Sequence, residues 1–363
     1  MAATRVLLTG DEGTGTLAAV RGLRAAGYEP WLAVSADRTY AARSRAAGGV
    51  LRVPDPKDDP MAHVRQVASE ARRLGVAAVL PGTEGSLRAL TGQEGFFEMP
   101  LGVSEPDALE RATDKATLAR FATAAGLESP PTHEVVDGAL PDAIELPAIA
   151  KPVASVTAED GVLRSYEVVR AETREDLERA VRSGGRWLVQ PYLHGTLGAV
   201  GGVVWEGRLV CAVHQVSPRI WPVERGISSY AVTVPPNEAL ETGIAKLLEL
   251  VGWSGVFGVQ FIHVRGRSYV IDLNPRIYGS TALAIAAGQN LPAIWVDLLL
   301  GRDPRVGPYR VGTRYRVEED DVRAILQTRQ WRGLVPRSNT VHGVFDWRDP
   351  APSLESLRKL LRL

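Results

Sequence analysis

The chain has 363 residues, of which 45% are apolar and 23% are charged, a composition typical of globular proteins with more than one domain. Its 42 Lys and Arg residues balance 42 Asp and Glu residues, so no overall charge favours binding to nucleic acid or to an anionic membrane. A single cysteine, Cys211, excludes an intramolecular disulfide and a cysteine-based zinc cluster. These properties favour small-molecule partners.

The N-terminus leads through Thr4 and Arg5 directly into an apolar segment, without the long apolar core and cleavage site of a signal peptide. No apolar run reaches the roughly 18 residues that would predict a transmembrane helix. We therefore expect a cytoplasmic protein.

Residues 5–110 alternate short apolar segments with amphipathic ones, which predicts parallel strands joined by helices. The predicted strands are 6–9, 30–34, 49–53 and 77–81, and the predicted helices are 16–26, 40–47 and 61–74. This order predicts a doubly wound α/β sheet whose loops gather at the carboxyl ends of the strands.

The first turn of this region, GDEGTG at 10–15, is similar to a dinucleotide-binding fingerprint, and Asp37 stands where a ribose-binding acid would lie. Its glycine spacing differs from the fingerprint, however, and Asp11 and Glu12 would repel a pyrophosphate. We therefore expect loops 10–15 and 82–86 to contact substrate and not a nicotinamide cofactor.

From residue 114 the pattern changes to two α+β blocks and a tail. The first has predicted helices 114–125 and 174–182 and predicted strands 132–136, 148–151, 165–169 and 187–190. The second has predicted strands 200–205, 208–215, 230–234, 255–264 and 268–273, with turns at 206–207 and 265–267, and predicted helices 238–251, 280–287 and 292–301. The tail from residue 303 has predicted helices 319–328 and 354–361.

The sequence VIDLNPR at 270–276 carries the strongest chemical signal. Asp272 and Asn274 lie two residues apart on a predicted strand, so their side chains share one face, and Gln260 on a neighbouring strand can join them. Oxygen donors of this kind suit Mg²⁺, and Arg276 follows directly. The alternative is a buried edge strand that leaves through an Asn-Pro turn, with Asp272 in a salt bridge.

Two lysines precede this motif. Lys115 stands at a predicted helix start, and Lys151 ends the apolar strand 148–151, where solvation of its charge requires an anion. The alternatives are a solvated helix residue for Lys115 and a surface charge for Lys151.

A segment that could hold a nucleotide base follows at 190–193. Pro191 breaks the strand, so Gln190, Pro191, Tyr192 and Leu193 can present backbone N–H and C=O groups to an adenine edge. The alternative is a simple crossover between domains.

Five motifs in chain order resemble the ATP-grasp superfamily: DK at 114–115, AKP at 150–152, VQPYLHG at 189–195, VQF at 259–261 and IDLNPR at 271–276. The last two are similar to the ATP-binding modules of carbamoyl phosphate synthetase. GISSYA at 226–231 and WSG at 253–255 are similar to predicted bacterial ATP-dependent carboxylate-amine ligases.

The resemblance implies a pre-ATP-grasp domain at 1–113, two ATP-grasp subdomains of α+β fold at 114–194 and 195–304, and a C-terminal extension at 305–363. MgATP would lie between the two subdomains. Lys115 and Lys151 would contact the α- and β-phosphates, and the backbone at 190–193 would hold adenine.

The resemblance also implies two Mg²⁺ ions, which Mn²⁺ can replace. Gln260 and Asp272 would bind one ion, and Asp272 and Asn274 the second. Arg276 would stabilise an acyl phosphate and the oxyanion formed on amine attack, and Arg219, in the loop 215–228, would contact the γ-phosphate.

Three features depart from the family pattern. The loop at 153–161, which would cover the phosphates, contains one glycine where the family has several, and 196–201 contains no acid for the ribose hydroxyls. Gln260 stands where many ligases have glutamate.

We expect an ADP-forming ligase that activates a carboxylate as an acyl phosphate and joins it to an amine or amino acid. The alternatives are a kinase or carboxyphosphate-forming enzyme of the same fold, and a non-catalytic nucleotide-binding regulator. The partners would be small carboxylates and amines, without nucleic acid or membrane. Tryptophans and apolar helices in the tail are compatible with a homodimer.

Overall fold

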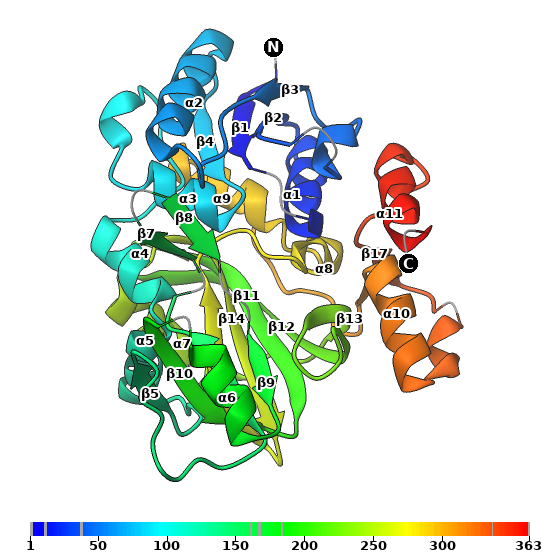
Figure 1. Ribbon diagram of the computed structural model, residues 1–363. Helices are drawn as coiled ribbons and strands as arrows, with labels where there is room; N and C mark the ends of the chain where they lie inside the picture. Colours follow the sequence, from blue (N-terminus) through cyan, green and yellow to red (C-terminus); the bar gives the residue numbers. More distant parts are fainter. Residues whose placement is uncertain are drawn as a thin grey trace.

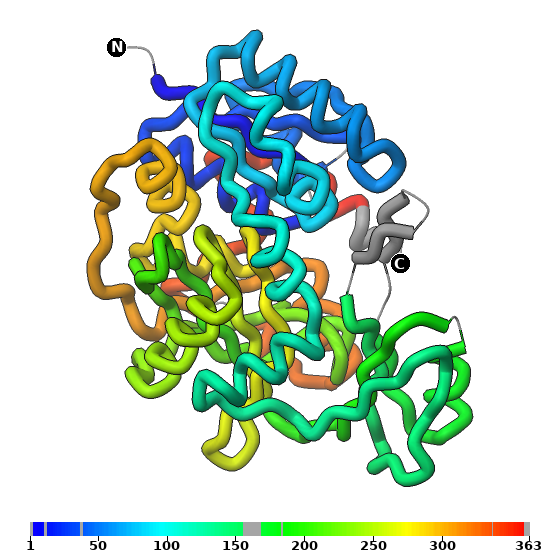
Figure 2. Tube along the Cα trace, turned by 90° about the vertical axis from the view of Figure 1, so that its left-hand side faces the viewer, coloured from blue at the N-terminus to red at the C-terminus, as the bar shows by residue number. Residues whose placement is uncertain are grey.

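The computed structural model describes residues 3–10, 13–36, 39–154, 156–159, 162–165, 168–182, 184–335 and 337–361, and the strands of this part form four sheets. Figure 1 shows the N-terminal sheet at the top, the large sheet through the centre and the C-terminal helices on the right. Figure 2, turned by 90°, shows the described residues near 130–150 and 170–190 projecting from the lower part of the molecule. Asp11, Glu12 and Asp37 lie outside the described residues, as do 155, 160 and 161 of the glycine-poor loop.

The N-terminal sheet is parallel, with strand order β3-β2-β1-β4. Its strands are β1 (Arg5–Thr9), β2 (Glu29–Val34), β3 (Gly49–Arg52) and β4 (Ala78–Pro81), and its helices are α1 (Gly13–Ala25), η1 (Ala41–Arg43), α2 (Pro60–Leu74), α3 (Glu84–Leu90), η2 (Glu94–Phe96) and α4 (Pro106–Thr113). Leu8 packs in one core cluster with α1, and Leu7 packs in another with α2, so helices cover both faces. The doubly wound arrangement is therefore present, but the predicted helix 40–47 is wrong, because only the short turn η1 forms there.

The second sheet has strand order β5-β10-β6-β9 and is antiparallel. Its strands are β5 (His133–Val136), β6 (Ala148–Pro152), β9 (Val169–Ala171) and β10 (Arg186–Pro191), and it is accompanied by α5 (Lys115–Ala124), α6 (Arg174–Val181) and the hairpin of β7 (Val156–Glu159) and β8 (Val162–Ser165). The predicted strand 165–169 is wrong, since β8 ends at Ser165 and β9 begins at Val169; residues 166 and 167 lie outside the described part.

The large sheet has strand order β15-β14-β11-β12-β13-β16-β17. Its first five strands along the chain are β11 (Thr196–Trp205), β12 (Arg208–Trp221), β13 (Ile227–Thr233), β14 (Gly255–Val264) and β15 (Arg267–Asn274), and its helices are α7 (Glu238–Val251), α8 (Thr281–Ala287) and α9 (Leu291–Leu299). Both two-residue turns, at 206–207 and 265–266, have left-handed backbone at each position, the conformation that favours tight hairpins. The hairpin predictions are thus confirmed.

The tail adds two strands that the sequence did not predict. β16 (Arg314–Arg316) pairs with β13, and β17 (Thr340–His342) pairs with β16. The remaining elements are α10 (Glu318–Thr328), η3 (Trp331–Leu334) and α11 (Ala351–Leu361). The tail is therefore continuous with the large sheet, while the boundaries of the four domains stay predictions.

The largest core cluster joins the N-terminal domain to the large sheet through the buried side chains of α1, α9 and β11. In the described part of the chain, no single helix is long and apolar enough to cross a membrane. Only α8 and α9 taken together pass that test, by length and composition, and they are bent by 89° at the break between them.

Candidate active site

Two cavities adjoin on one side of the large sheet. The hinge cavity, about 260 Å³, is lined by Lys115, Lys151, Asp272 and residues 190–193. The central cavity, about 300 Å³, is lined by residues of the large sheet, the N-terminal domain and the tail. Leu197, Ile227 and Gln260 line both, so the two cavities meet at these side chains.

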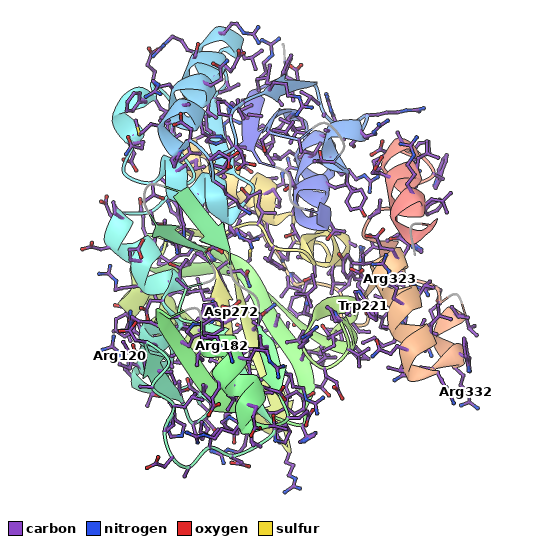
Figure 3. All side chains as sticks on the ribbon, viewed as in Figure 1. Arg120, Arg182, Trp221, Asp272, Arg323 and Arg332 are labelled. Carbon is purple, nitrogen blue, oxygen red and sulfur yellow. The ribbon has the colours of Figure 1, made fainter. Side chains whose placement is uncertain are left out.

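Two buried lysines lie beside the carboxylate of Asp272 in the hinge cavity. Lys115 and Lys151 are only 8% and 6% exposed, whereas the Asp272 side chain is 29% exposed. The Lys115 ammonium lies 3.6 Å from Asp272 Oδ1, and Lys151 Nζ donates to the Ile271 carbonyl at 2.8 Å. Figure 3 shows Asp272 near the middle of the molecule. Two buried ammonium groups in one cavity suit a phosphate chain.

The local fold accounts for both lysine positions. Asp114 caps α5 by accepting from the Thr117 N–H at 2.6 Å, which places Lys115 at the first helical residue. The Lys115 N–H donates to the Val153 carbonyl at 2.9 Å and so ties the helix start to the end of β6, where Lys151 lies.

The pKa of Lys151 reflects this environment. Burial lowers it from 10.5 to about 8; the charge of Asp272 opposes the decrease, and the charge of Lys115 adds to it. An anion that entered the hinge cavity would raise this pKa again, so the protonation of Lys151 is coupled to ligand binding.

The predicted oxygen donors occupy one face of β14 and β15. Gln260 lies directly opposite Asp272 in the antiparallel register, and Asn274, two residues further along, lies opposite Gly258. The register shifts between Gln260 and Phe261, which bulges β15 at Ile271 and directs its carbonyl to Lys151. Asp272 forms a salt bridge, as the alternative interpretation expects, and also lines the cavity, while its role as a metal ligand stays a prediction.

This donor set fits Mg²⁺ chemically, since all three side chains offer oxygen. It supplies a single negative charge, however, and the described residues contain no group of three or more His, Cys, Asp or Glu side chains that could hold a metal. A divalent ion here would therefore need further anionic ligands from a bound phosphate chain.

The hinge segment lines its cavity as predicted, but one of its backbone donors is occupied. The Tyr192 N–H donates to the Pro147 carbonyl at 2.8 Å, and the Gln190 side chain donates to Thr132 Oγ1 at 2.8 Å. Ile149 and Ile262 line the same cavity and provide an apolar surface. The segment can therefore contact a flat base, with fewer free N–H groups than the sequence predicted.

Glu224 is a site residue that the sequence analysis missed. It lies between β12 and β13, lines the hinge cavity and pairs with Arg170, whose guanidinium lies 4.4 Å from the centre of the Tyr192 ring. Nothing local in the sequence marked it, because it follows the hinge by more than thirty residues.

The central cavity contains Asn274 and Arg276 together with residues from distant parts of the chain. Arg276 Nη1 donates to the Ile277 carbonyl at 3.0 Å, while its buried Nε has no hydrogen-bond partner among the described residues. The other polar lining residues are Thr14, Tyr40, Gln215, Ser228, Gln260, Tyr278, Ser280, Tyr315, Glu319 and Asp320. The cavity thus offers both a guanidinium and carboxylates to a substrate.

Part of the lining of the central cavity was predictable from the sequence. Gly13 and Thr14 of the predicted substrate loop do line the central cavity. The second predicted loop has a structural role instead, because Thr83 caps α3, and Thr83 and Ser86 pack against Gly10. Glu319 accepts from the Tyr40 hydroxyl at 2.8 Å across a separation that no local motif could reveal.

Arg219 is not brought together with the other predicted residues. Its guanidinium forms a bidentate pair with the buried Asp321, at 2.5 and 2.9 Å, and lies 4.2 Å from the centre of the Tyr230 ring. It lines a third cavity on the tail side of the sheet. The buried carboxylate needs this cation, which explains why Arg219 points away from the hinge and central cavities.

Comparisons with known proteins identify what the chain is similar to. Residues 184–321 match the family model described as ATP-grasp in the biosynthetic pathway with Ter operon. The carbamoyl phosphate synthase large chain of Gemmatimonas aurantiaca is 26% identical over 299 residues, which is 78% of this chain; the chain spans 26% of that relative's length.

Solved structures share the fold at low sequence identity. The L-amino acid ligase from Bacillus licheniformis is 16% identical with a TM-score of 0.64, over 82% of this chain and 75% of that chain. An ADP complex of N5-carboxyaminoimidazole ribonucleotide synthetase is 14% identical with a TM-score of 0.65, over 91% and 86%. Biotin carboxylase from Campylobacter jejuni is 15% identical with a TM-score of 0.62, over 85% and 74%. The chain therefore has an ATP-grasp fold, and the resemblance to the ATP-grasp superfamily is confirmed.

Proposed function

We propose that the chain is an ADP-forming, ATP-dependent ligase that activates a carboxylate as an acyl phosphate and joins it to an amine or amino acid. The observation that carries this proposal is the meeting of the hinge and central cavities at Gln260. A nucleotide in the first cavity would direct its terminal phosphate to an acceptor held in the second.

In this proposal the base lies against Ile149 and the backbone of residues 190–193. Lys115 and Lys151 neutralise the α- and β-phosphates, as their burial in one cavity supports. Glu224 holds the ribose hydroxyls in place of the acid that is missing from 196–201.

Gln260, Asp272 and Asn274 would hold two Mg²⁺ ions, which Mn²⁺ can replace. When bound, such ions offset the negative charge of the phosphate chain and of the phosphoryl group in transfer. The pairing of Asp272 with Lys115 keeps the carboxylate oriented towards the hinge cavity.

Arg276 would bind the acceptor carboxylate and stabilise the oxyanion formed when the amine attacks. Glu319 and Asp320, which line the same cavity, fit an ammonium group, and this supports an amino acid as substrate. The N-terminal domain would act as the pre-ATP-grasp domain and contribute Thr14. The homodimer stays a prediction that light scattering would test.

A screen of amino acid pairs with MgATP tests the function. We expect ADP release that depends on both amino acids and, by mass spectrometry, a condensed product. ADP release with a phosphorylated product and no condensation would indicate a kinase, and amine-independent release stimulated by bicarbonate would indicate a carboxyphosphate-forming enzyme. MgATP binding without turnover in any mixture would indicate a regulator.

A further inference from the structure

The third cavity, about 830 Å³, is lined by arginines and is called the arginine cavity below. Its arginines are Arg219, Arg314, Arg316, Arg329, Arg332 and Arg337, and Tyr230, Trp331 and His342 also line it. It is separated from the central cavity by β16, because Tyr315 lines the central cavity while its neighbours Arg314 and Arg316 line the arginine cavity.

Part of this positive charge is balanced by buried carboxylates. Asp321, which is fully buried, pairs with Arg219 at 2.5 Å and with Arg316 at 2.6 Å. One carboxylate thus serves two guanidinium groups. His342 pairs with Glu318 at 3.1 Å.

The other four arginines have no such balance. Arg314 donates to the Ser338 carbonyl at 3.2 Å and pairs with no carboxylate among the described residues. Arg329, Arg332 and Arg337 are exposed and pair with no carboxylate in the described part of the chain. A chain with no net charge therefore concentrates a positive excess in one cavity.

The C-terminus of α10 explains only one of these residues. Arg329 is the left-handed C-cap of that helix, where a cation interacts favourably with the helix dipole. Arg332 and Arg337 follow on η3 and the next segment, and Arg314 comes from β16. Like charges gathered from four segments repel one another unless an anion lies between them.

We propose that the arginine cavity binds a small polyanion, a molecule with two or more phosphate or carboxylate groups. Guanidinium groups bind both anions through paired N–H donors, and the volume lies in the range of small-molecule sites. Trp331, 55% exposed at the same cavity, offers a flat surface to the rest of the ligand. This inference stands independently of the proposed ligase activity.

Calorimetric titration of the full chain with inorganic tripolyphosphate and with citrate tests the site. We expect at least one of the two to bind, and the double variant Arg332→Glu/Arg337→Glu to bind it about tenfold more weakly or worse. The matched control is Arg120→Glu/Arg182→Glu, which changes the net charge equally at exposed positions on α5 and beyond α6. Figure 3 shows Arg332 at the lower right, near α10, and both control residues away from it.

The outcomes separate the possible ligands and sites. Binding of tripolyphosphate alone supports a phosphorylated ligand, binding of citrate alone supports a polycarboxylate, and binding of both supports either class. The proposal is overturned if neither binds, if the two double variants weaken binding equally, or if only Lys151→Gln abolishes it. Tight binding of a single-stranded RNA without binding of either small anion also contradicts it. Unchanged thermal unfolding of each double variant shows that it is folded.

Discussion

At the scale of single residues, we expect Lys151 to make nucleotide binding sensitive to pH. Its pKa is lowered by burial to about 8, so an increasing fraction loses its charge above that pH. Only the protonated ammonium attracts phosphate, and we therefore expect MgATP affinity to fall as the pH rises from about 7 to about 9. Calorimetric titration across this range measures the effect.

The control for this prediction is a pair of variants. Lys151→Gln should bind MgATP weakly and with little pH dependence, whereas Lys246→Gln, at an exposed position of α7, should behave like the parent protein. A parent-like pH dependence in Lys151→Gln would assign the titration to another group.

In the proposed function, Arg276 takes part in the chemistry and does not bind the nucleotide. It lines the central cavity and is not among the residues of the hinge cavity. We expect Arg276→Ala to retain MgATP affinity and to lose about 10²- to 10³-fold in kcat for condensation, the loss typical of a missing oxyanion contact. Arg265→Ala, in the exposed hairpin turn, should leave kcat unchanged. Loss of MgATP binding in Arg276→Ala would contradict the assignment.

At the scale of elements, Gly201 on β11 lets the side chain of Tyr278 pack closely against the large sheet. A Cβ at this position would overlap the Tyr278 hydroxyl, and Tyr278 is buried and lines that cavity. We expect Gly201→Ala to lower the free energy of unfolding by about 1–3 kcal/mol through overpacking. Denaturant unfolding measures this, with Gly307→Ala as the control, since a Cβ there meets no atom within 4 Å. Equal stability of the two variants would argue against close packing.

The elements that sequence could predict are those specified locally. The turns at 206–207 and 265–266 carry glycine where the backbone is left-handed, so the hairpins of the large sheet were predictable. β16 and β17 are three residues each, too short for a periodic pattern. β16 also pairs with β13, more than eighty residues earlier, a contact that only the folded sheet creates.

The residues of the candidate site also fall into those that the local sequence predicts and those that it does not. Lys115, Lys151, Gln260 and Asp272 lie on elements whose ends follow from capping, strand length and register, and they meet in one cavity. Tyr40, Gln215, Glu224, Tyr315 and Glu319 carry no local signal, because distant segments bring them to the cavities. Arg219 was predicted to contact the γ-phosphate, but it pairs with Asp321, a buried carboxylate on the tail that no local sequence pattern placed beside it.

At the scale of the whole molecule, Asp349 fastens the tail to the N-terminal domain. It accepts from the Ser44 hydroxyl at 2.5 Å and the Arg45 N–H at 3.0 Å, and it pairs with Arg21 at 3.0 Å. Burial alone would raise its pKa, but these hydrogen bonds and the charge of Arg21 hold the pKa of Asp349 below its usual value.

The lowered pKa fixes the sign of a stability prediction. The contribution of Asp349 is complete above the unfolded-state pKa of about 3.9 and is lost as the pH falls through the lower pKa of the folded state. We expect Asp349→Asn to unfold at lower denaturant than the parent at neutral pH, with the difference shrinking below about pH 4. Asp303→Asn, at an exposed position, should show no difference. If the stability difference between Asp349→Asn and the parent protein stays constant below about pH 4, the charge of Asp349 does not stabilise the fold.

A crystal structure of the protein with Mg²⁺ and a non-hydrolysable ATP analogue tests the central claim most directly. We expect the base in the hinge cavity, divalent ions at Gln260, Asp272 and Asn274, and the terminal phosphate at the junction that leads to Arg276. A nucleotide found in the arginine cavity or at the N-terminal turn, with the Asp272 carboxylate contacting no metal ion, would contradict the account.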